Sequence, residues 1–356
     1  MARVDAIFRA VKDCGATDLH IATGSPPMLR VNGELRPIEI SDLSDEIIRQ
    51  MFHEIMSDDV RAEYEKQRDA DFAYEIPGVA RVRCNVYEQR GGVAGAFRLL
   101  PNQILTFEQL GLPQQAVRLA GFARGLVLVT GPPGSGKSST LAAVIDHVNR
   151  TQRKHIITIE DPIEYVHRSQ NCLVNQREVG VHARGFAAAL RAALREDPDI
   201  VLVGELRDLE TIELAVTAAE TGQLVYGTLH TMGAHQTVDR IIDAFPEDRQ
   251  QQIRIMLSES LRAVLSQRLL PRADREGRAV ACEVLFATPA IGAMIRDQKT
   301  FQIPSMLQTG KREGMQTMDD SLAALVQAGA VSAEEAGRYM ANRDLINRLR
   351  AGARAA

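Results

Sequence analysis

The stretch of sequence that decides the fold is a glycine-rich loop that reads Gly131-Pro132-Pro133-Gly134-Ser135-Gly136-Lys137-Ser138-Ser139. Residues 131–138 match the pattern G-x-x-x-x-G-K-[ST], between an apolar run at 126–130 and a helical period at 138–149. In such a loop, backbone N–H groups and the start of the helix bind nucleotide phosphates. We expect Lys137 to reach the β- and γ-phosphates and the Ser138 hydroxyl to ligate Mg²⁺. The loop therefore predicts a site for ATP or GTP with Mg²⁺.

Short apolar runs alternate with helical periods on both sides of this loop. The runs lie at 126–129, 156–159, 200–203 and 224–226, and the helical periods at 141–148 and 209–219. Continuous apolar strands with helices between them are typical of a parallel sheet covered on both faces. We predict an α/β domain here, with a helical region after about residue 250.

The first hundred residues have a different pattern. Residues 81–87 alternate, so that Val82, Cys84 and Val86 share one face of a strand and Arg83 lies on the other. A chain of 356 residues exceeds the usual size of one core. We predict an α+β domain over 1–100, a linker over 101–113 and an α/β domain over 114–356.

Composition excludes several classes of function. A net charge of −4, an aromatic content of 4% and the absence of tryptophan argue against a nucleic-acid partner. We expect no signal peptide, and no apolar run of the sequence approaches the ~20 residues of a membrane span. Four scattered cysteines match neither a zinc motif nor a disulfide framework. We expect a cytoplasmic protein with no integral membrane segment.

Polar residues follow three of the predicted strands. Glu160 and Asp161 follow 156–159, Glu205 follows 200–203, and His230 follows 224–228. Carboxyl ends of parallel strands form the ligand crevice of an open sheet. Glu205 is predicted to be the general base that orients the attacking water, and His230 to sense the γ-phosphate. Because Gly204 stands where a metal-binding aspartate is usual, we name Glu164 as a candidate helper of Ser138 at Mg²⁺.

Four arginines are candidates for contacting a γ-phosphate from a neighbouring subunit or domain. Arg191 and Arg195 are four residues apart on a predicted helix, Arg83 lies on the polar face of the strand 81–87, and Arg98 follows. Positive charge stabilises the phosphate as its bond breaks. The alternative for each arginine is an ordinary solvated surface position.

The motifs together resemble the secretion-type ATPases, and among them the type IV pilus retraction ATPases (the PilT and PilU group). Besides the loop, the resemblance rests on 159–167 (Ile-Glu-Asp-Pro-Ile-Glu-Tyr-Val-His), 203–208 (Val-Gly-Glu-Leu-Arg-Asp) and 221–231 (Thr-Gly-Gln-Leu-Val-Tyr-Gly-Thr-Leu-His-Thr). Shorter matches lie at 18–20, 175–178 and 314–317.

The resemblance implies a homohexamer with a PAS-like N-terminal domain and a RecA-like ATPase domain, with ATP bound between them. It implies Glu205 as the catalytic glutamate, with Glu164 and His230 completing the site and the four arginines as fingers. It also implies a cytoplasmic motor on the inner membrane, partnered by the platform protein at the pilus base and by a paralogous retraction ATPase.

Two departures leave alternatives open. Pro133 stands where most relatives have threonine, which leaves the backbone contacts to phosphate intact. In residues 290–297, Gly292 stands where the retraction motif of the family has arginine. An accessory, PilU-like retraction ATPase, a related secretion or pilus-assembly ATPase, a nucleic-acid motor and a regulatory subunit without turnover are the alternatives to a retraction motor.

Overall fold

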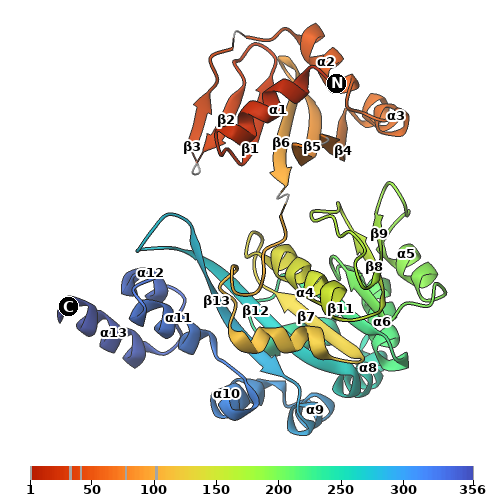
Figure 1. The fold of residues 1–356 in the computed structure, drawn as a ribbon. Coiled ribbons are helices and arrows are strands. Elements are labelled where there is room, and N and C mark those ends of the chain that lie inside the picture. Colours follow the sequence, from red (N-terminus) through yellow and green to blue (C-terminus); the bar gives the residue numbers. More distant parts are fainter. Residues whose placement is uncertain (1, 32–33, 41, 77, 101–102, 356) are drawn as a thin grey trace. The chain divides into compact units, whose positions relative to one another are not determined.

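The computed structural model describes residues 2–31, 34–40, 42–76, 78–100 and 103–355, with side chains as far as Ala351 (Figure 1). The chain divides into two compact units. The first comprises Met1–Gln103 and Pro162–Val166, and the second Ile104–Asp161 and His167–Ala356. Residues 101 and 102 of the predicted linker lie outside the described residues.

The first unit is an antiparallel sheet with its helices packed on one face. The strands are β1 (Asp18–Ala22), β2 (Met28–Val31), β3 (Glu34–Pro37), β4 (Asp69–Ile76), β5 (Ala80–Gln89) and β6 (Gly92–Leu100), in the order β3-β2-β1-β6-β5-β4. The helices are α1 (Val4–Asp13), α2 (Asp45–His53) and α3 (Asp58–Gln67). The alternation predicted for 81–87 is confirmed, because Val82, Cys84 and Val86 are buried in the core with Phe8 of α1 and Phe52 of α2.

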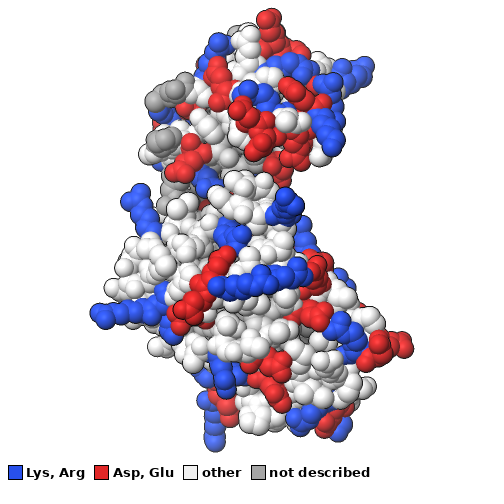
Figure 2. Space-filling view, turned by 90° about the vertical axis from the view of Figure 1, so that its right-hand side faces the viewer, with Lys and Arg blue, Asp and Glu red and all other residues white. Residues whose placement is uncertain are grey.

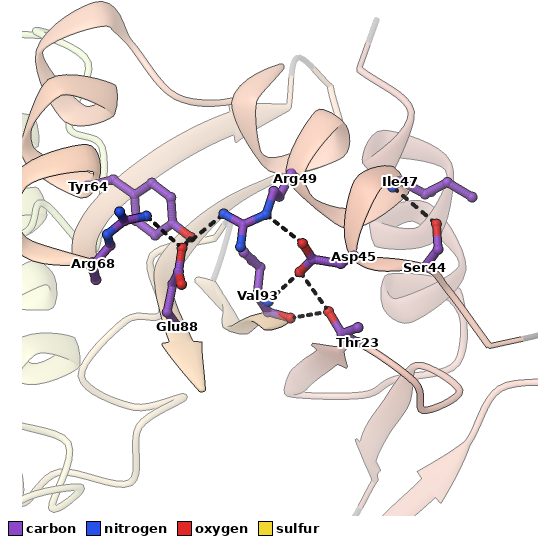
Figure 3. A network of polar contacts seen from close by, with 9 residues as sticks. All are labelled: Thr23, Ser44, Asp45, Ile47, Arg49, Tyr64, Arg68, Glu88 and Val93. Carbon is purple, nitrogen blue, oxygen red and sulfur yellow. Dashed lines mark hydrogen bonds and ion pairs between the residues drawn. The ribbon is translucent and has the colours of Figure 1, made fainter. Parts of the chain in front are cut away.

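A polar network ties helices α2 and α3 to this sheet (Figure 3). Asp45 accepts hydrogen bonds from Val93 N at 2.7 Å and from Arg49 Nε at 2.6 Å. Arg49 also donates to Glu88 Oε1 at 2.9 Å, and Arg68 donates to the same oxygen at 3.1 Å. Hydrogen bonds from Val93 and Arg49 hold the pKa of Asp45 below its ordinary value, and Arg49 lowers the pKa of Glu88. The network therefore stabilises the unit while both carboxyls are ionised.

The second unit is built on a twisted, mostly parallel sheet. Its strands are β7 (Gly125–Thr130), β8 (His155–Glu160), β9 (Leu173–Glu178), β10 (Ile200–Val203), β11 (Leu224–Leu229), β12 (Leu261–Pro271) and β13 (Arg278–Phe286), in the order β13-β12-β7-β11-β10-β8-β9. Within this sheet, among the described residues, the β12–β13 pair is antiparallel and the other strand pairs are parallel. The parallel α/β fold predicted around the loop is confirmed.

Helices cover both faces of this sheet, as the apolar runs predicted. The helical segments are η1 (Gln114–Gly121), α4 (Lys137–Thr151), α5 (Phe186–Ala193), α6 (Leu209–Thr221), α7 (Ala234–Asp243), α8 (Glu247–Ser260), α9 (Pro289–Arg296), η2 (Thr300–Gln302), α10 (Ile303–Thr309), η3 (Gly310–Glu313), α11 (Met318–Gln327), α12 (Ala333–Gly337) and α13 (Arg343–Ala355). Along β7, Leu126 and Leu128 pack into one core, whereas Val127 and Val129 pack into a second core against α4. Strand β7 is therefore fully buried between two helical layers.

The prediction that the chain is helical after residue 250 is wrong over residues 261–286. Strand β12 begins directly after α8, and β13 returns beside it. Polar residues Arg262, Ser266, Gln267 and Arg268 interrupt the apolar positions of β12 and conceal the strand in the sequence. The prediction holds from α9 onward.

Gly292 of α9 lies against the backbone of α8. A Cβ atom at this position would lie 2.9 Å from the carbonyl oxygen of Ser258. Real Cβ atoms do not approach a backbone oxygen so closely, so any larger residue requires the helices to separate. Glycine at 292 thus allows α9 to pack closely against the backbone of α8. In the described residues no helix is both long and apolar enough to cross a lipid bilayer.

Candidate active site

The glycine-rich loop connects β7 to α4, as the sequence predicts, and is tightly fixed. At Gly131, φ is 140°, and a Cβ atom there would lie 2.2 Å from Gln267 O and 2.7 Å from Ser135 Oγ. At Gly136, φ is 88°, in the left-handed region that favours glycine. The Gln267 side chain on β12 donates from Nε2 to Ser135 O at 2.7 Å. The loop is thus held in a cradle shape both by its own glycines and by the neighbouring strand.

The predicted loop residues differ in exposure. Exposed are Pro133, Gly134 and Ser138, partly buried are Pro132, Gly136, Lys137 and Ser139, and buried are Gly131 and Ser135. Ser135 Oγ is buried and has no hydrogen-bond partner among the described residues. A buried hydroxyl without a partner is costly unless a ligand supplies one. The exposed Ser138 hydroxyl at the start of α4 is available to a ligand.

Lys137 lies across the loop, and its ammonium group contacts backbone carbonyl oxygens of the loop. Its Nζ atom donates to Gly131 O at 2.9 Å and to Pro132 O at 3.2 Å, and lies 3.2 Å from Nδ1 of His230. Carbonyl oxygens are weaker partners for an ammonium group than phosphate oxygens. The loop, the buried Ser135 hydroxyl and Lys137 therefore fit a nucleotide polyphosphate.

Glu205 and His230 lie together at the ends of the adjacent parallel strands β10 and β11. Glu205 Oε1 is 3.0 Å from His230 Nε2, and Glu205 Oε2 is 2.8 Å from a terminal nitrogen of Arg207. The side chain of Glu205 is 20% exposed. Burial raises the pKa of Glu205, but Arg207 and then His230 outweigh it and hold this pKa below the ordinary value. Glu205 is therefore an ionised carboxylate with a fixed orientation.

The contacts of His230 identify its tautomer. An ammonium group has only donors, so Nδ1 of His230 is the acceptor for Lys137. The ring proton of neutral His230 then lies on Nε2 and is donated to Glu205. Lys137, His230 and Glu205 thus form one hydrogen-bonded chain from the phosphate loop to the carboxylate.

The backbone around Glu205 is anchored to β11. Thr228 Oγ1 donates to Gly204 O at 2.5 Å, and Leu206 N donates to Thr228 O at 3.0 Å. Downstream, Asp208 caps α6 by accepting a hydrogen bond from Thr211 N at 2.9 Å. The segment that carries Glu205 is therefore fixed on both sides.

Two other acidic candidates are placed differently. Glu160, at the end of β8, accepts hydrogen bonds from Thr158 Oγ1 at 2.6 Å and from Gln176 Nε2 at 3.1 Å. Glu164 lies in Pro162–Val166, the segment that belongs to the first unit. Its role at Mg²⁺ stays a prediction.

Three of the four candidate arginines pair with carboxylates of their own unit. Arg83 and Arg98 are direct neighbours across β5 and β6, and they pair with Asp71 at 2.5 Å and with Asp18 at 2.8 Å. Arg191 on α5 forms an ion pair with Glu210. These contacts are the ordinary surface pairing that was the alternative, and a role in trans stays a prediction.

Arg195 does not lie on the same helix as Arg191, which corrects the prediction. Helix α5 ends at Ala193, and Leu194 is its C-terminal cap. The turn that follows includes Asp197, whose φ is 53°. The spacing of four residues therefore does not place the two guanidinium groups on one helical face.

Arg207 and Gln267 belong to this site and are not among the residues predicted from the sequence. Arg207 lies only two residues from Glu205, and its position in the loop after a strand could have been noticed. Gln267 is separated by 132 residues from Ser135, whose carbonyl it binds. Local pattern carries no signal for such a contact.

Comparison with known proteins decides the family. The family described as "Type II/IV secretion system protein" matches residues 2–343. The chain belongs to this family of secretion and pilus ATPases. The resemblance inferred from the motifs is therefore confirmed, including the arrangement of an N-terminal domain and an ATPase domain.

Several relatives are pilus proteins. The chain is 52% identical over 322 residues to the type IV pilus retraction ATPase PilT of Pseudomonas aeruginosa, covering 90% of this chain and 93% of the relative. It is 51% identical over 321 residues to a twitching motility protein of Neisseria gonorrhoeae, covering 90% and 86% of the two chains. It is 38% identical over 346 residues to the type IV pilus ATPase PilU of Pseudomonas aeruginosa, covering 97% and 90%.

Solved structures show the same fold. The crystal structure of the pilus retraction motor PilT with bound ADP matches with a TM-score of 0.90 at 44% identity, over 98% of this chain and 99% of that one. The ATPase DotB of Legionella pneumophila matches with a TM-score of 0.80 at 28% identity, over 94% of each chain.

Proposed function

We propose that this protein is an ATP-hydrolysing motor that powers type IV pilus retraction, and hence pilus disassembly and twitching motility. The observation that best supports ATP hydrolysis is the row of hydrogen bonds Lys137–His230–Glu205, which connects the phosphate loop to an ionised carboxylate. The similarity to PilT over nearly the whole chain supports the cellular role.

The proposed reaction is hydrolysis of the γ-phosphoryl group of ATP. Glu205 accepts a proton from the attacking water, whose oxygen bonds to the γ-phosphorus. The bond from that phosphorus to the β–γ bridging oxygen breaks, and ADP and phosphate leave. Lys137 exchanges its contacts with loop carbonyls for contacts with phosphate oxygens, which accept stronger, charge-assisted hydrogen bonds.

The metal ion has a defined place in this proposal. The Ser138 hydroxyl and Glu164 are the proposed ligands of Mg²⁺, together with phosphate oxygens. When bound, Mg²⁺ neutralises charge that develops on the phosphate oxygens. Hydroxyl and carboxylate oxygens are the hard ligands that Mg²⁺ prefers.

His230 is the proposed sensor of the γ-phosphate. Its Nδ1 atom now accepts from Lys137, while Nε2 donates to Glu205. When Lys137 turns to phosphate, Nδ1 of His230 loses its donor, and the ring becomes free to rotate. The state of the loop thereby reaches the catalytic carboxylate.

Assembly and location are part of the same proposal. The protein is proposed to act as a homohexamer in the cytoplasm, docked on the inner-membrane platform protein at the pilus base, with a paralogous retraction ATPase as a further partner. Arg83, Arg98, Arg191 and Arg195 are the proposed fingers contributed in trans. Of the two Pseudomonas aeruginosa relatives, PilT is more similar than PilU, at 52% against 38% identity, which favours the main motor over the accessory one.

A nucleic-acid motor is the less favoured alternative. On the face drawn in Figure 2, acidic and basic side chains are interspersed over each unit and do not form a field of one sign. The net charge is −4. Both observations disfavour a phosphate-backbone partner.

The test is Glu205→Gln in the full-length protein. The variant keeps the size of the side chain but cannot accept a proton, so it should bind ATP normally and lose nearly all turnover. Glu213→Gln is a matched control and should hydrolyse ATP at the wild-type rate, because Glu213 lies on α6 and pairs with Arg249 at 2.5 Å. Phosphate release at wild-type rate from Glu205→Gln would overturn the mechanism.

A further inference from the structure

Arg207 lies beside Glu205 and forms an ion pair with it. Its guanidinium group lies 2.8 Å from Glu205 Oε2, whereas His230 binds Oε1 at 3.0 Å. The two oxygens of one carboxylate are thus bound from different elements, the β10–α6 loop and the end of β11.

A carboxylate that is bound through both oxygens, as Glu205 is, is held more rigidly than one bound through a single oxygen. A carboxylate held through a single oxygen can rotate about its terminal torsion, which is a broad and soft degree of freedom. Since the backbone at Gly204 and Leu206 is anchored to Thr228, the torsions of the Glu205 side chain are the remaining freedom. Arg207 removes the last of these by binding the second oxygen.

We propose that Arg207 is a positioning residue for hydrolysis, which holds the Glu205 carboxylate in the orientation that accepts the proton of the attacking water. The proposal rests on the proposed function of Glu205. Each carboxylate oxygen has two lone pairs, so both oxygens keep an acceptor site for water while they are bound.

The charges around Glu205 define a second effect of Arg207. The groups that act on it are Arg207 from its own loop and His230 from β11, and Lys137 acts through His230. Asp161, at the end of β8, is a further acidic group that acts on Arg207. Loss of Arg207 would therefore raise the pKa of Glu205 toward its ordinary value. The acid limb of the pH profile, where activity falls as Glu205 becomes protonated, would then move to higher pH.

The exposure of Arg207 makes it suitable for substitution. Its side chain is 63% exposed, so a change there leaves the core intact. Arg207→Met keeps an unbranched, flexible stem and removes every donor. Arg207→Lys restores a positive donor on a flexible stem.

The experiment measures steady-state ATP hydrolysis of the full-length assembly between about pH 3.5 and pH 8, a range that includes the pH at which a glutamate carboxyl titrates. For Arg207→Met we expect kcat to fall about tenfold, KM for ATP to change less than about twofold, and the acid limb to move to higher pH. Arg207→Lys should recover most of kcat. The control is Arg249→Met, which breaks the Arg249–Glu213 pair elsewhere on the same unit and should leave both parameters unchanged.

Each contrary outcome is distinct. A wild-type kcat and an unchanged acid limb in Arg207→Met would overturn the positioning role. A higher kcat than wild type would overturn it too, because the Arg207–Glu205 ion pair would then hinder catalysis by Glu205. A large rise in KM with unchanged kcat would overturn it by showing that Arg207 binds phosphate. If Glu205→Gln hydrolyses ATP at wild-type rate, the proposed function of Glu205 fails as well, whereas an inactive Glu205→Gln beside a fully active Arg207→Met overturns only the Arg207 proposal.

Discussion

Gln267 connects strand β12 to the phosphate loop through one buried hydrogen bond, and Gln267→Leu tests what that bond contributes. In the native chain Nε2 donates to Ser135 O at 2.7 Å, and the Gln267 side chain is buried. Leucine has a similar size but no donor, so the Ser135 carbonyl loses its partner. A buried carbonyl without a partner costs about 1–3 kcal/mol.

The cost should appear mainly as weaker nucleotide binding. Without Gln267, the loop relaxes so that Ser135 O reaches water, and binding must restore the cradle shape. The buried Oε1 atom of Gln267 has no partner among the described residues, so its removal offsets part of the loss. We therefore expect a net loss of about 1–2 kcal/mol, which corresponds to a Kd for ADP about 5 to 30 times weaker.

The assay is titration of the purified full-length protein with a fluorescent ADP analogue, with thermal unfolding measured in parallel. Gln152→Leu is the matched control, because Gln152 Nε2 donates to Ala120 O at 2.8 Å. Gln152 caps the far end of α4, ~22 Å from Lys137 along the helix. This control should lower stability and leave Kd unchanged. A wild-type Kd in Gln267→Leu, or an equal loss in both variants, would refute the reasoning.

Three further predictions concern stability. Gly292→Ala places a Cβ atom 2.9 Å from Ser258 O. The cost of this overpacking should exceed the gain in helix propensity, so we expect the free energy of unfolding to fall by about 1 kcal/mol. A urea midpoint higher than that of the wild type would contradict this. Arg49→Met should lower the free energy of unfolding of the first unit at neutral pH. The difference from wild type should become smaller as pH falls below about 4.5, because the lowered pKa values of Asp45 and Glu88 contribute stability that protonation removes. Urea midpoints of both proteins, measured as a function of pH, test this. Burial lowers the pKa of His167 to about 4 from an ordinary value of 6.5, so the unfolded chain binds more protons between these values and stability should rise with pH across that window. His167→Gln should remove this slope, which proton uptake on unfolding measures directly.

The parts of the fold that could be predicted from sequence are those where burial leaves a continuous apolar pattern. Strands β7 and β10 are buried on both faces, so Leu126–Val129 and Ile200–Val203 consist entirely of apolar residues. The positions of Glu205 and His230 followed, because parallel strands bring their carboxyl ends to one edge of the sheet. Their mutual contact, however, depends on side-chain torsions that no periodicity reports.

The parts that could not be predicted are set by distant contacts. Strand β12 carries Ser266 and Gln267 in its interior because these residues bind Thr130 and Ser135 beside the loop, and these polar positions conceal the strand. Strand β9 lies at the sheet edge, and its less exposed alternate positions are Val174, Gln176 and Glu178, so only one apolar residue marks that face in the sequence. The partners of Arg83 and Arg98 were likewise invisible, because Asp71 and Asp18 approach them only through strand pairing.

The central claim is that ATP hydrolysis at Glu205 drives pilus disassembly. The most direct test replaces the chromosomal gene with one encoding Glu205→Gln and counts surface pili per cell by electron microscopy. We expect pili to accumulate on the variant cells, because extension continues while retraction stops. Fewer pili than in wild type would contradict the assigned direction of the motor, and an unchanged number would contradict its role in retraction.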